Sequence, residues 1–366
     1  MTQEEYWFWL CNINDIYQDT IDRLIREFGG PEMVFRASAD QLIRSGAVGP
    51  RRARLIADSK SSTRSLRKLE KLAGNGIRFI YYKGPDYPEK FALLEDRPYA
   101  FYVKGTMPDP KMPSVGIVGS RVCSGYGKEM TMKFSQCLAS NGVQIISGMA
   151  LGVDAIASRS AIEAGGKTFV VLGSGLDVIY PRQNIDLYYQ ILLNQGGIIS
   201  EFPMGDPPLP WHFPHRNRLI SALSDQLLVI EARRSSGSLS TASCALNQGK
   251  DVYALPGRIT DPMSEGCNRL IADGAGVLLD PQMLLEECFR GRGRTDFEQK
   301  DWDAAGPELT GDQKGVYEAL DYQPKMLDRI AAESALSCER TAKVLTELEL
   351  LGVCSEISKD YYRKGT

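Results

Sequence analysis

The sequence predicts an α/β protein with a mostly parallel central sheet wrapped by helices, and with smaller helical regions on both sides of it. Between residues 76 and 290, apolar strand-like runs alternate with helical stretches, which is typical of strand–helix–strand units. Several of these runs, such as "TFVVLG" and "QLLVIEA", lack polar alternation, as expected for strands buried on both faces. The chain of 366 residues is also about twice the length of a single domain.

Changes in pattern divide the chain into four parts. Residues 1–75 carry helical apolar spacing and predict a helical domain of the SAM or helix-hairpin-helix type. Residues 76–290 form the predicted sheet domain. The stretch 291–308 loses periodicity and is predicted to be a linker. Residues 309–366 show three short helical runs and a hairpin, which predict a winged-helix-like domain.

The elements of the sheet domain are predicted from short apolar runs and from the amphipathic stretches between them. Strands are expected at 115–119, 143–147, 168–172, 197–200, 226–231, 251–254 and 277–279. Helices are expected at 125–140, 154–164, 184–194, 216–223, 238–248 and 267–273.

The composition narrows the function classes. A net charge of −3 gives no global sign of nucleic acid binding, so a basic site has to be local. No apolar run approaches the roughly 20 residues of a membrane span, and the N-terminus "MTQEEYWFWL" lacks the basic region of a signal peptide. The eight cysteines include no Cys-x-x-Cys pair, which indicates reduced thiols without a zinc site. We therefore expect a cytoplasmic protein with no metal, no cofactor and no membrane contact.

The segment 115–127, "VGIVGSRVCSGYG", has the pattern of a strand that runs into a phosphate-binding turn. Its glycines do not have the Gly-x-Gly-x-x-Gly spacing of a dinucleotide site. The next strand ends in Ser147-Gly148, without the acidic residue that would hold a ribose. Arg121 stands where a dinucleotide fold has a small neutral residue. The turn is therefore predicted to bind a different anion.

Glycine and serine also follow the other predicted strands. The strand ends contain "GSR", "SGMALGVD", "GSGLDVIYPRQN", "SEFPMG" and "EARRSSGSLSTA". Ligands of open parallel sheets bind outside the carboxyl ends of the strands. Backbone N–H groups in such turns, and the helix N-termini that follow them, favour anions. Five such ends on one edge predict an anion-binding site.

Arginines and aromatic residues indicate the kind of anion. The cations expected at this edge or its rim are Arg121, Arg182, Arg216, Arg218 and Arg233. Arg216-Asn217-Arg218 opens a helix, where the helix dipole disfavours cations. Helix preference therefore does not explain these arginines, and an interaction partner is expected there. The aromatic residues nearby are Tyr180, Phe202, Trp211 and Phe213, and the core is the preferred place for the first two. Stacking aromatics in an arginine-lined groove are typical of single-stranded nucleic acid binding.

A set of motifs in this order closely resembles the DprA/Smf family of DNA-processing proteins. The motifs are "GIVGSR", "SGMALGVDAIA", "LGSGLDVIYPRQN", "FPHRNRLISALSD", "EARRSSGSLSTASCA", "VYALPGR" and "GCNRLIADGA". They cover about residues 80–280 without interruption, and such a set is very specific. The resemblance implies an extended Rossmann-like domain that binds single-stranded DNA as a homodimer without catalysis. For bacterial members it also implies protection of incoming DNA and loading of RecA recombinase during natural transformation.

The resemblance also implies DNA contacts at the Gly-Ser-Arg loop, the basic residue after "YP" and the aromatic residue before the "RNR" helix. The family often has lysine after "YP", so Arg182 departs from the pattern but keeps the charge. Together with the strand-end residues, the predicted DNA-binding residues are Gly119, Ser120, Arg121, Ser147, Gly148, Arg182, Asn184, Phe213, Arg216, Asn217 and Arg218.

The flanking domains give weaker signals. Residues 42–56 approach a helix-hairpin-helix pattern, but Ala47 replaces the first glycine of the turn unless Gly46 substitutes for it. Residues 51–71 carry a local basic excess, which suits a solvated helix face as well as a DNA contact. The third helical run of the last domain, 338–351, is net acidic, so packing or partner contact is expected there in preference to groove reading.

Two other functions remain open from the residues alone. The sheet could carry a small-nucleotide sensor or a nucleoside-phosphate hydrolase, with Glu231 as the candidate acid. Alternatively, the central domain could act only as a platform for dimerisation and protein docking. Released base from nucleoside monophosphates would identify the hydrolase, and loop variants that disturb association but not DNA binding would identify the platform.

Overall fold

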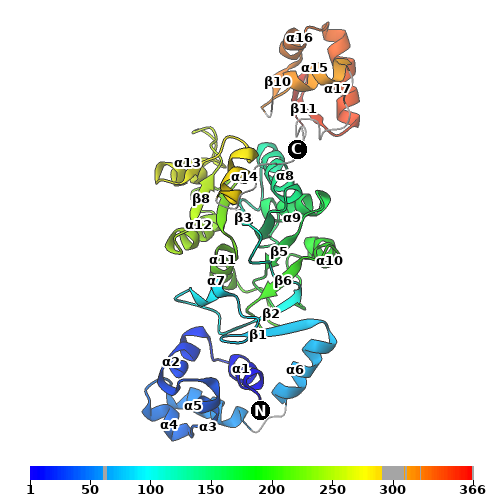
Figure 1. The fold of residues 1–366 in the computed structure, drawn as a ribbon. Helices are drawn as coiled ribbons and strands as arrows, with labels where there is room; N and C mark the ends of the chain where they lie inside the picture. Colours follow the sequence, from blue (N-terminus) through cyan, green and yellow to red (C-terminus); the bar gives the residue numbers. More distant parts are fainter. Residues whose placement is uncertain (61–63, 291–308, 310, 322, 365–366) are drawn as a thin grey trace.

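The computed structural model describes residues 1–60, 64–290, 309, 311–321 and 323–364 of the chain. A helical domain, an α/β domain and a small domain of helices and short strands follow one another in the sequence (Figure 1). The predicted linker 291–308 lies outside the described residues. Within them, no helix has both the length and the apolar character needed to cross a membrane. The predicted α/β class with a mostly parallel sheet is confirmed.

The first domain consists of helices. They are α1 (Gln3–Cys11), α2 (Gln18–Phe28), α3 (Pro31–Arg36), α4 (Ala39–Arg44), α5 (Pro50–Ser59) and α6 (Arg64–Gly74). In the turn between α4 and α5, Gly46 has a φ of 75° and Gly49 precedes the first turn of α5. Gly46 thus takes the left-handed position of the hairpin, which a residue with a Cβ adopts only with strain.

The central sheet has nine strands. They are β1 (Ile77–Tyr81), β2 (Ala100–Gly105), β3 (Ser114–Val118), β4 (Gln144–Ser147), β5 (Thr168–Val171), β6 (Gly197–Ser200), β7 (Gln226–Val229), β8 (Asp251–Ala254) and β9 (Gly276–Val277). Their order is β1-β2-β6-β5-β4-β3-β7-β8-β9. The two pairings that involve β2 are antiparallel, and all others are parallel. Since the strand order reverses between β3 and β7, a ligand crevice is expected at their carboxyl ends.

Helices cover both faces of the sheet (Figure 1). The helices of this domain are α7 (Glu89–Ala92), α8 (Gly125–Ser140), α9 (Val153–Glu163), α10 (Ile185–Leu193), α11 (His212–Leu223), α12 (Gly237–Asn247), α13 (Glu265–Ala272) and α14 (Pro281–Phe289), with a 3₁₀ turn η1 (Arg182–Asn184). One core joins the strands to α8, α9 and α14, through residues such as Phe134 and Leu284. The other joins them to α7, α11 and α12, through residues such as Phe91 and Leu219.

The C-terminal domain has the elements of a winged helix. It contains α15 (Gly311–Ala319), β10 (Lys325–Met326), α16 (Leu327–Ser334), α17 (Cys338–Leu350), β11 (Cys354–Ser358) and β12 (Tyr361–Lys364). The three strands pair antiparallel in the order β10-β12-β11. Val316, Ile330 and Leu345 are fully buried in its own core.

Most elements of the central domain lie within two residues of their predicted bounds. The predicted helix 216–223 is longer, because α11 starts at His212 and includes Pro214 in its first turn, where proline is tolerated. Four elements were not predicted, namely β1, β2, α7 and α14. The two strands lie in the segment before the first glycine-rich turn, outside the strand–helix repeat used for prediction, and they form the antiparallel edge of the sheet.

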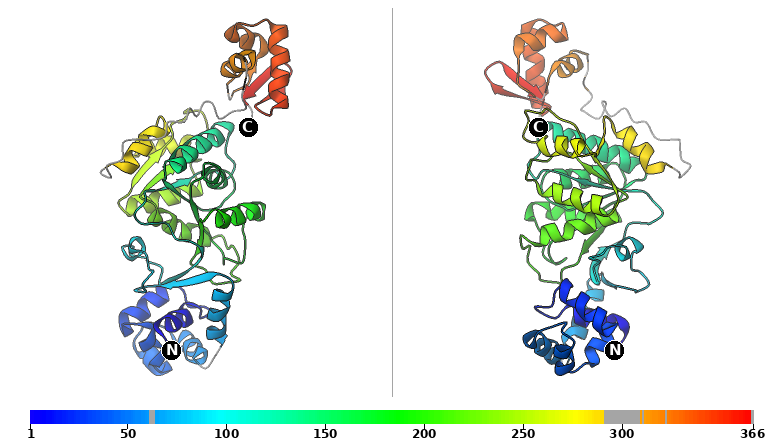
Figure 2. Two further views of the ribbon diagram at one scale, coloured as in Figure 1. Left: turned by 45° about the vertical axis from the view of Figure 1, so that its right-hand side comes forward. Right: turned by 90° about the vertical axis from the view of Figure 1, so that its left-hand side faces the viewer.

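The first domain packs on this antiparallel edge (Figure 2). Phe8 of α1 contacts Phe79 of β1 edge-to-face, with ring centroids 5.0 Å apart. Tyr102 of β2 donates a hydrogen bond of 2.9 Å to the side chain of Asn12. Apolar and polar contacts therefore tie the helical domain to the sheet through β1 and β2.

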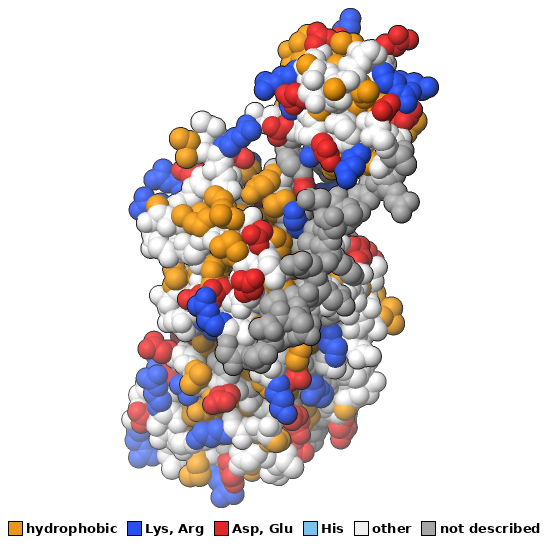
Figure 3. Space-filling view, turned by 45° about the horizontal axis from the view of Figure 1, so that its top comes forward, with side chains coloured by type: hydrophobic (Ala, Val, Ile, Leu, Met, Phe, Trp, Pro, Cys, Tyr) orange, Lys and Arg blue, Asp and Glu red, His pale blue; other side chains and the backbone are white. Residues whose placement is uncertain are grey.

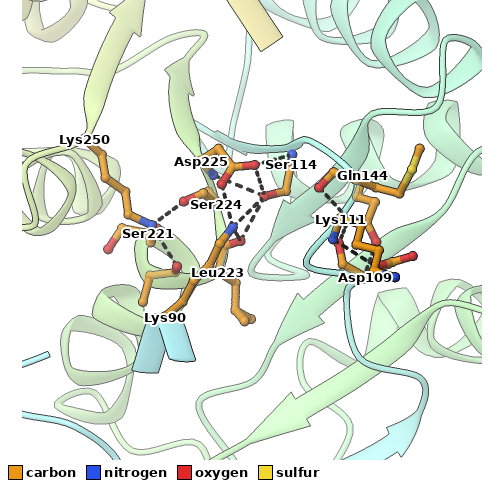
Figure 4. A network of polar contacts seen from close by, with 12 residues as sticks. Lys90, Asp109, Lys111, Ser114, Gln144, Ser221, Leu223, Ser224, Asp225 and Lys250 are labelled. Atoms are coloured by element: carbon orange, nitrogen blue, oxygen red, sulfur yellow. Dashed lines mark hydrogen bonds and ion pairs between the residues drawn. The ribbon is translucent and has the colours of Figure 1, made fainter. Parts of the chain in front are cut away.

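A polar network fastens the amino ends of β3 and β7 (Figure 4). Asp225 accepts hydrogen bonds from Lys90 Nζ at 2.7 Å and from the backbone N–H of Ser114 at 2.9 Å. Lys250 donates to the carbonyls of Ser221 at 2.6 Å and Ala222 at 2.7 Å, at the end of α11. These contacts join α7 and α11 to the sheet at the edge opposite the strand-end turns.

Candidate nucleic-acid interface

A pocket of about 520 Å³ lies at the carboxyl end of β3, beside the first turns of α11 and α12. Its lining includes Gly119 and Arg121 after β3, Phe213 and Arg216 of α11, and Gly237 at the start of α12. This is the crevice expected where the strand order reverses. Gly119 permits close packing there, since a Cβ on it would lie 2.7 Å from the side chain of Val153.

Arg121 and Phe213 lie in contact in the lining of the pocket. The guanidinium carbon of Arg121 lies 5.4 Å from the centroid of the Phe213 ring, within the range of a cation–π contact. Arg121 is solvent-exposed and Phe213 is half-buried. Tyr180, which is 43% exposed, lies 5.7 Å from Phe213 between ring centroids. A phosphate can reach the guanidinium, and a base can reach the aromatic rings.

Arg216 forms the floor of the pocket. It is buried, and its Nη1 donates to the carbonyls of Gly148, at 2.7 Å, and of Val171. A Cβ on Gly148 would lie 2.4 Å from this guanidinium, so a larger residue there would displace the side chain of Arg216. Burial lowers the pKa of Arg216 to about 10, against the opposing effect of Asp154, so the side chain stays charged at neutral pH.

Asp154, at the start of α9, compensates part of this positive charge. Its carboxylate is buried and accepts a hydrogen bond of 3.3 Å from the backbone N–H of Ala150. Burial raises the pKa of Asp154, and nearby Arg216 and Arg121 work in the opposite direction. Because Arg216 and Asp154 are both buried and carry opposite charges, the exposed Arg121 is the pocket's positive group toward solvent.

Arg182 is exposed at the start of η1. Two residues later, the side chain of Asn184 is buried and donates to the carbonyls of Met149, at 3.0 Å, and Ala150, at 3.2 Å. These bonds hold η1 against the turn between β4 and α9. Asn184 therefore positions the backbone near Arg182.

Three of the predicted contact residues are structural, because their side chains are buried and already bonded. Ser147 Oγ donates to the carbonyl of Ile117 at 2.7 Å. Asn184 holds the turn described above. Arg218 forms a buried ion pair of 2.8 Å with Glu201 and an ion pair of 3.0 Å with the exposed Asp96. These three side chains therefore hold neighbouring turns and helices of the site in place.

The other predicted residues lie in or beside the pocket. Gly148 lies beneath Arg216, and Asn217 accepts a 3.1 Å hydrogen bond from Arg216 Nε. Ser120 Oγ folds back onto its own turn, where it donates to the carbonyl of Val122 at 2.8 Å. Arg233 is exposed but bonds to Met263 and does not line the pocket.

Glu231, His212 and His215 contact residues outside the pocket beside β3. Glu231 is buried against the start of α8, where it accepts hydrogen bonds from the backbone and the hydroxyl of Ser124. Burial raises its pKa, and the bonds from Ser124 oppose this rise. His212 contacts the carbonyl of Gly173, and His215 contacts Glu201 at 3.1 Å. None of these three lines the pocket at β3.

Two features of the site were not predicted from the sequence. Asp154 lies within the quoted stretch "SGMALGVD", and an acid directly after a glycine-rich turn is a signal that could have found it. The prolines Pro208 and Pro210 also line the pocket. They lie in the irregular segment between β6 and α11, where periodicity gives no signal.

Comparison with known proteins identifies the family. The family model described as DNA recombination-mediator protein A matches residues 78–289, and that of the DprA winged helix domain matches residues 300–357. Protein Smf of Escherichia coli is 33% identical over 99% of this chain and 96% of its own length. DNA processing protein DprA of Streptococcus pneumoniae is 41% identical, over 55% of this chain and 71% of its own length.

Solved structures agree with this result. The crystal structure of DprA from Streptococcus pneumoniae has a TM-score of 0.66 at 31% identity, covering 82% of this chain and 99% of its own. A structure of DNA processing protein A from Helicobacter pylori, described for its single-stranded DNA binding mode, has a TM-score of 0.51 at 32% identity. It covers 58% of this chain and 97% of its own. The chain therefore belongs to the DprA/Smf family of DNA-processing proteins.

Proposed function

We propose that this protein binds single-stranded DNA at the pocket beside β3, without catalysing a reaction on it. The observation that carries the proposal is the exposed Arg121 guanidinium on the half-buried ring of Phe213, at the carboxyl ends of parallel strands. Arg121 and Arg182 bind phosphates, together with the backbone of Gly119 and Ser120. Phe213 stacks a base. The related Helicobacter pylori protein, described for its single-stranded DNA binding mode, supports this assignment.

The position of the phosphates follows from the charges of the pocket. Arg216 is buried near the opposite charge of Asp154 and bonded to backbone carbonyls, so its role is to hold the floor of the pocket in shape. Arg121 and Arg182 are exposed and belong to separate turns of the same sheet edge. Two separated cations suit a chain of phosphates better than a single phosphate group.

The biological role is DNA processing in natural transformation, where the protein protects incoming strands and loads RecA recombinase onto them in the cytoplasm. The family membership supports this role. Handing a strand to a recombinase requires binding that is independent of base sequence, and backbone contacts with stacking have this property.

We also propose that the protein acts as a homodimer. Hydrophobic side chains gather on the side of the central domain that carries β8 and α12–α14 (Figure 3). In this region β9 is an edge strand, and the exposed apolar residues beside it are Val277 (39%), Leu279 (75%) and Met283 (40%). An apolar patch next to an open strand edge is typical of a surface that pairs with another chain.

Incubation with labelled single-stranded oligonucleotide and with nucleoside monophosphates tests the proposal. We expect the oligonucleotide to be retarded in a native gel, and chromatography to recover both the DNA and the monophosphates unchanged. Release of free base would contradict the proposal and indicate the hydrolase with Glu231 as the acid. An oligonucleotide that is not retarded at low salt would instead indicate a platform for protein docking only.

A further inference from the structure

Two exposed aromatic residues meet where the helical domain adjoins the segment before α11. Trp211 is 50% exposed, and Tyr17, at the start of α2, is 55% exposed. Their ring centroids lie 6.0 Å apart with an interplanar angle of 88°, an edge-to-face arrangement. Large aromatic side chains of this kind are usually buried, so two of them half-exposed in contact indicate a binding surface.

This aromatic pair continues the pocket beside β3. Pro208 and Pro210 line that pocket, and Trp211 is the next residue in the chain. Phe213, the stacking residue of the proposed site, follows two positions later on α11. Behind Trp211, the rings of Phe202 and His212 stack on each other with centroids 3.8 Å apart. Trp211 contacts both of them, which gives its ring a firm support.

Two arginines of α5 lie beside the first turn of α2. Arg52 donates a 3.1 Å hydrogen bond to the hydroxyl of Thr20, one turn after Tyr17. Arg51 is 83% exposed and contacts Asp15 at 2.7 Å. An exposed ion pair of this kind contributes little free energy, so a phosphate competes with Asp15 for Arg51 at low cost. Arg51 and Arg52 therefore contact residues within three positions of Tyr17, on either side of it in the chain.

We propose that Tyr17 and Trp211 stack a nucleobase of the strand whose neighbouring part occupies the pocket beside β3, with Arg51 and Arg52 near the phosphate of that nucleotide. The inference rests on the proposed function and extends it, since the helical domain then takes part in DNA binding. A nucleobase is favoured over a protein side chain because the surface is continuous with the pocket and repeats its pairing of aromatic rings with arginine.

Affinities for oligothymidylates of about 6 and about 20 nucleotides test the inference, since the first lies near the lower end of the site sizes of single-strand binding proteins, about 4 to 16 nucleotides, and the second exceeds them. With the longer strand, Trp211→Ala and Tyr17→Ala are each expected to weaken binding by about 5- to 150-fold, the effect of one lost stacked base. With the shorter strand, which the pocket beside β3 holds alone, the loss is expected to stay below about threefold. Trp211→Phe is expected to retain most of the affinity, and Tyr189→Ala on α10, which removes a ring of 53% exposure, is the matched control.

A spectroscopic signal identifies the stacked ring directly. Trp7 and Trp9 are buried, at 5% and 2% exposure, and Trp302, the fourth tryptophan, lies outside the described residues. The experiment therefore uses a Trp302→Phe background, in which quenching of fluorescence by the long strand should come from Trp211 and disappear when Trp211→Phe is added. Quenching that persists in this variant would overturn the inference. If Trp211→Ala weakened the binding of both strands equally, Trp211 would only support Phe213, and the inference would be wrong. If it weakened the binding of neither strand, Trp211 would play no part in binding, which would also overturn the inference. Binding of the short strand by the wild type separates these results from a failure of the proposed function.

Discussion

Replacement of both Arg121 and Arg182 by alanine is expected to weaken the binding of a single-stranded oligonucleotide by at least about a hundredfold. Each charge-assisted contact to a phosphate is worth about 1.5 to 3 kcal/mol, or tenfold and more in affinity. Both side chains are exposed, so their removal leaves the fold intact. With two phosphate contacts fewer, binding releases fewer counterions from the DNA. The slope of log affinity against log salt should therefore also become shallower, by about 0.7 for each lost contact and about 1.4 in total. Fluorescence anisotropy over a salt series measures both quantities.

The control for this prediction is Arg269→Ala, which removes one exposed arginine on α13, outside the pocket. This variant should bind with the affinity and the salt slope of the wild type. If the double variant kept the wild-type slope, the phosphates would contact other residues and the assignment of Arg121 and Arg182 would be wrong.

Glu201→Gln is expected to lower the free energy of unfolding by about 3 kcal/mol. The carboxylate of Glu201 is 11% exposed and pairs with Arg218, which is 5% exposed, at 2.8 Å. Removing one member of such a pair leaves a buried charge without its partner, and this typically costs 3 to 5 kcal/mol. We expect the lower end, because Asp96 still contacts Arg218 at 3.0 Å. Urea denaturation followed by circular dichroism measures the change.

The stability difference should depend on pH. Burial raises the pKa of Glu201, but Arg218 and His215 outweigh this effect and hold the pKa below its ordinary value. A carboxyl group with a lowered pKa in the folded state contributes stability above the pKa of the unfolded chain, about 4.3. This contribution is lost as the pH falls through the folded-state pKa. The wild type and Glu201→Gln should therefore differ most near neutral pH and converge in acid.

The matched control is Asp273→Asn, which breaks the exposed ion pair with Arg269 and should change stability by less than about 1 kcal/mol. If Glu201→Gln changed the free energy of unfolding by as little as Asp273→Asn does, the Glu201–Arg218 ion pair would not have the stabilising effect expected of a buried pair.

The parallel part of the fold was predictable because its strands are buried on both faces. Runs such as 168–172 and 226–231 have no polar alternation, and glycine-rich turns mark where they end. The antiparallel edge formed by β1 and β2 was missed, since long-range pairing with β6 defines it and no local motif marks it.

The site was predictable only at the level of its turns. Arg216 and Arg218 stand two positions apart on α11 and look equivalent in the sequence. In the structure they point to different partners, Arg216 to the carbonyl of Gly148 and Arg218 to Glu201. Helical geometry separates such neighbours, and only the tertiary fold determines which of them lines a pocket. The contact between Tyr17 and Trp211 joins residues far apart in the chain and has no local signal.

The affinity of the wild-type protein for single-stranded and double-stranded oligonucleotides of the same sequence, across a salt series, tests the central claim most directly. We predict tighter binding of the single strand at every salt concentration, since stacking on Phe213 requires unpaired bases. The logarithm of the affinity should fall linearly with the logarithm of the salt concentration, because the phosphates contribute. Equal or tighter binding of the duplex, or an affinity for the single strand that does not change with salt, would contradict the account.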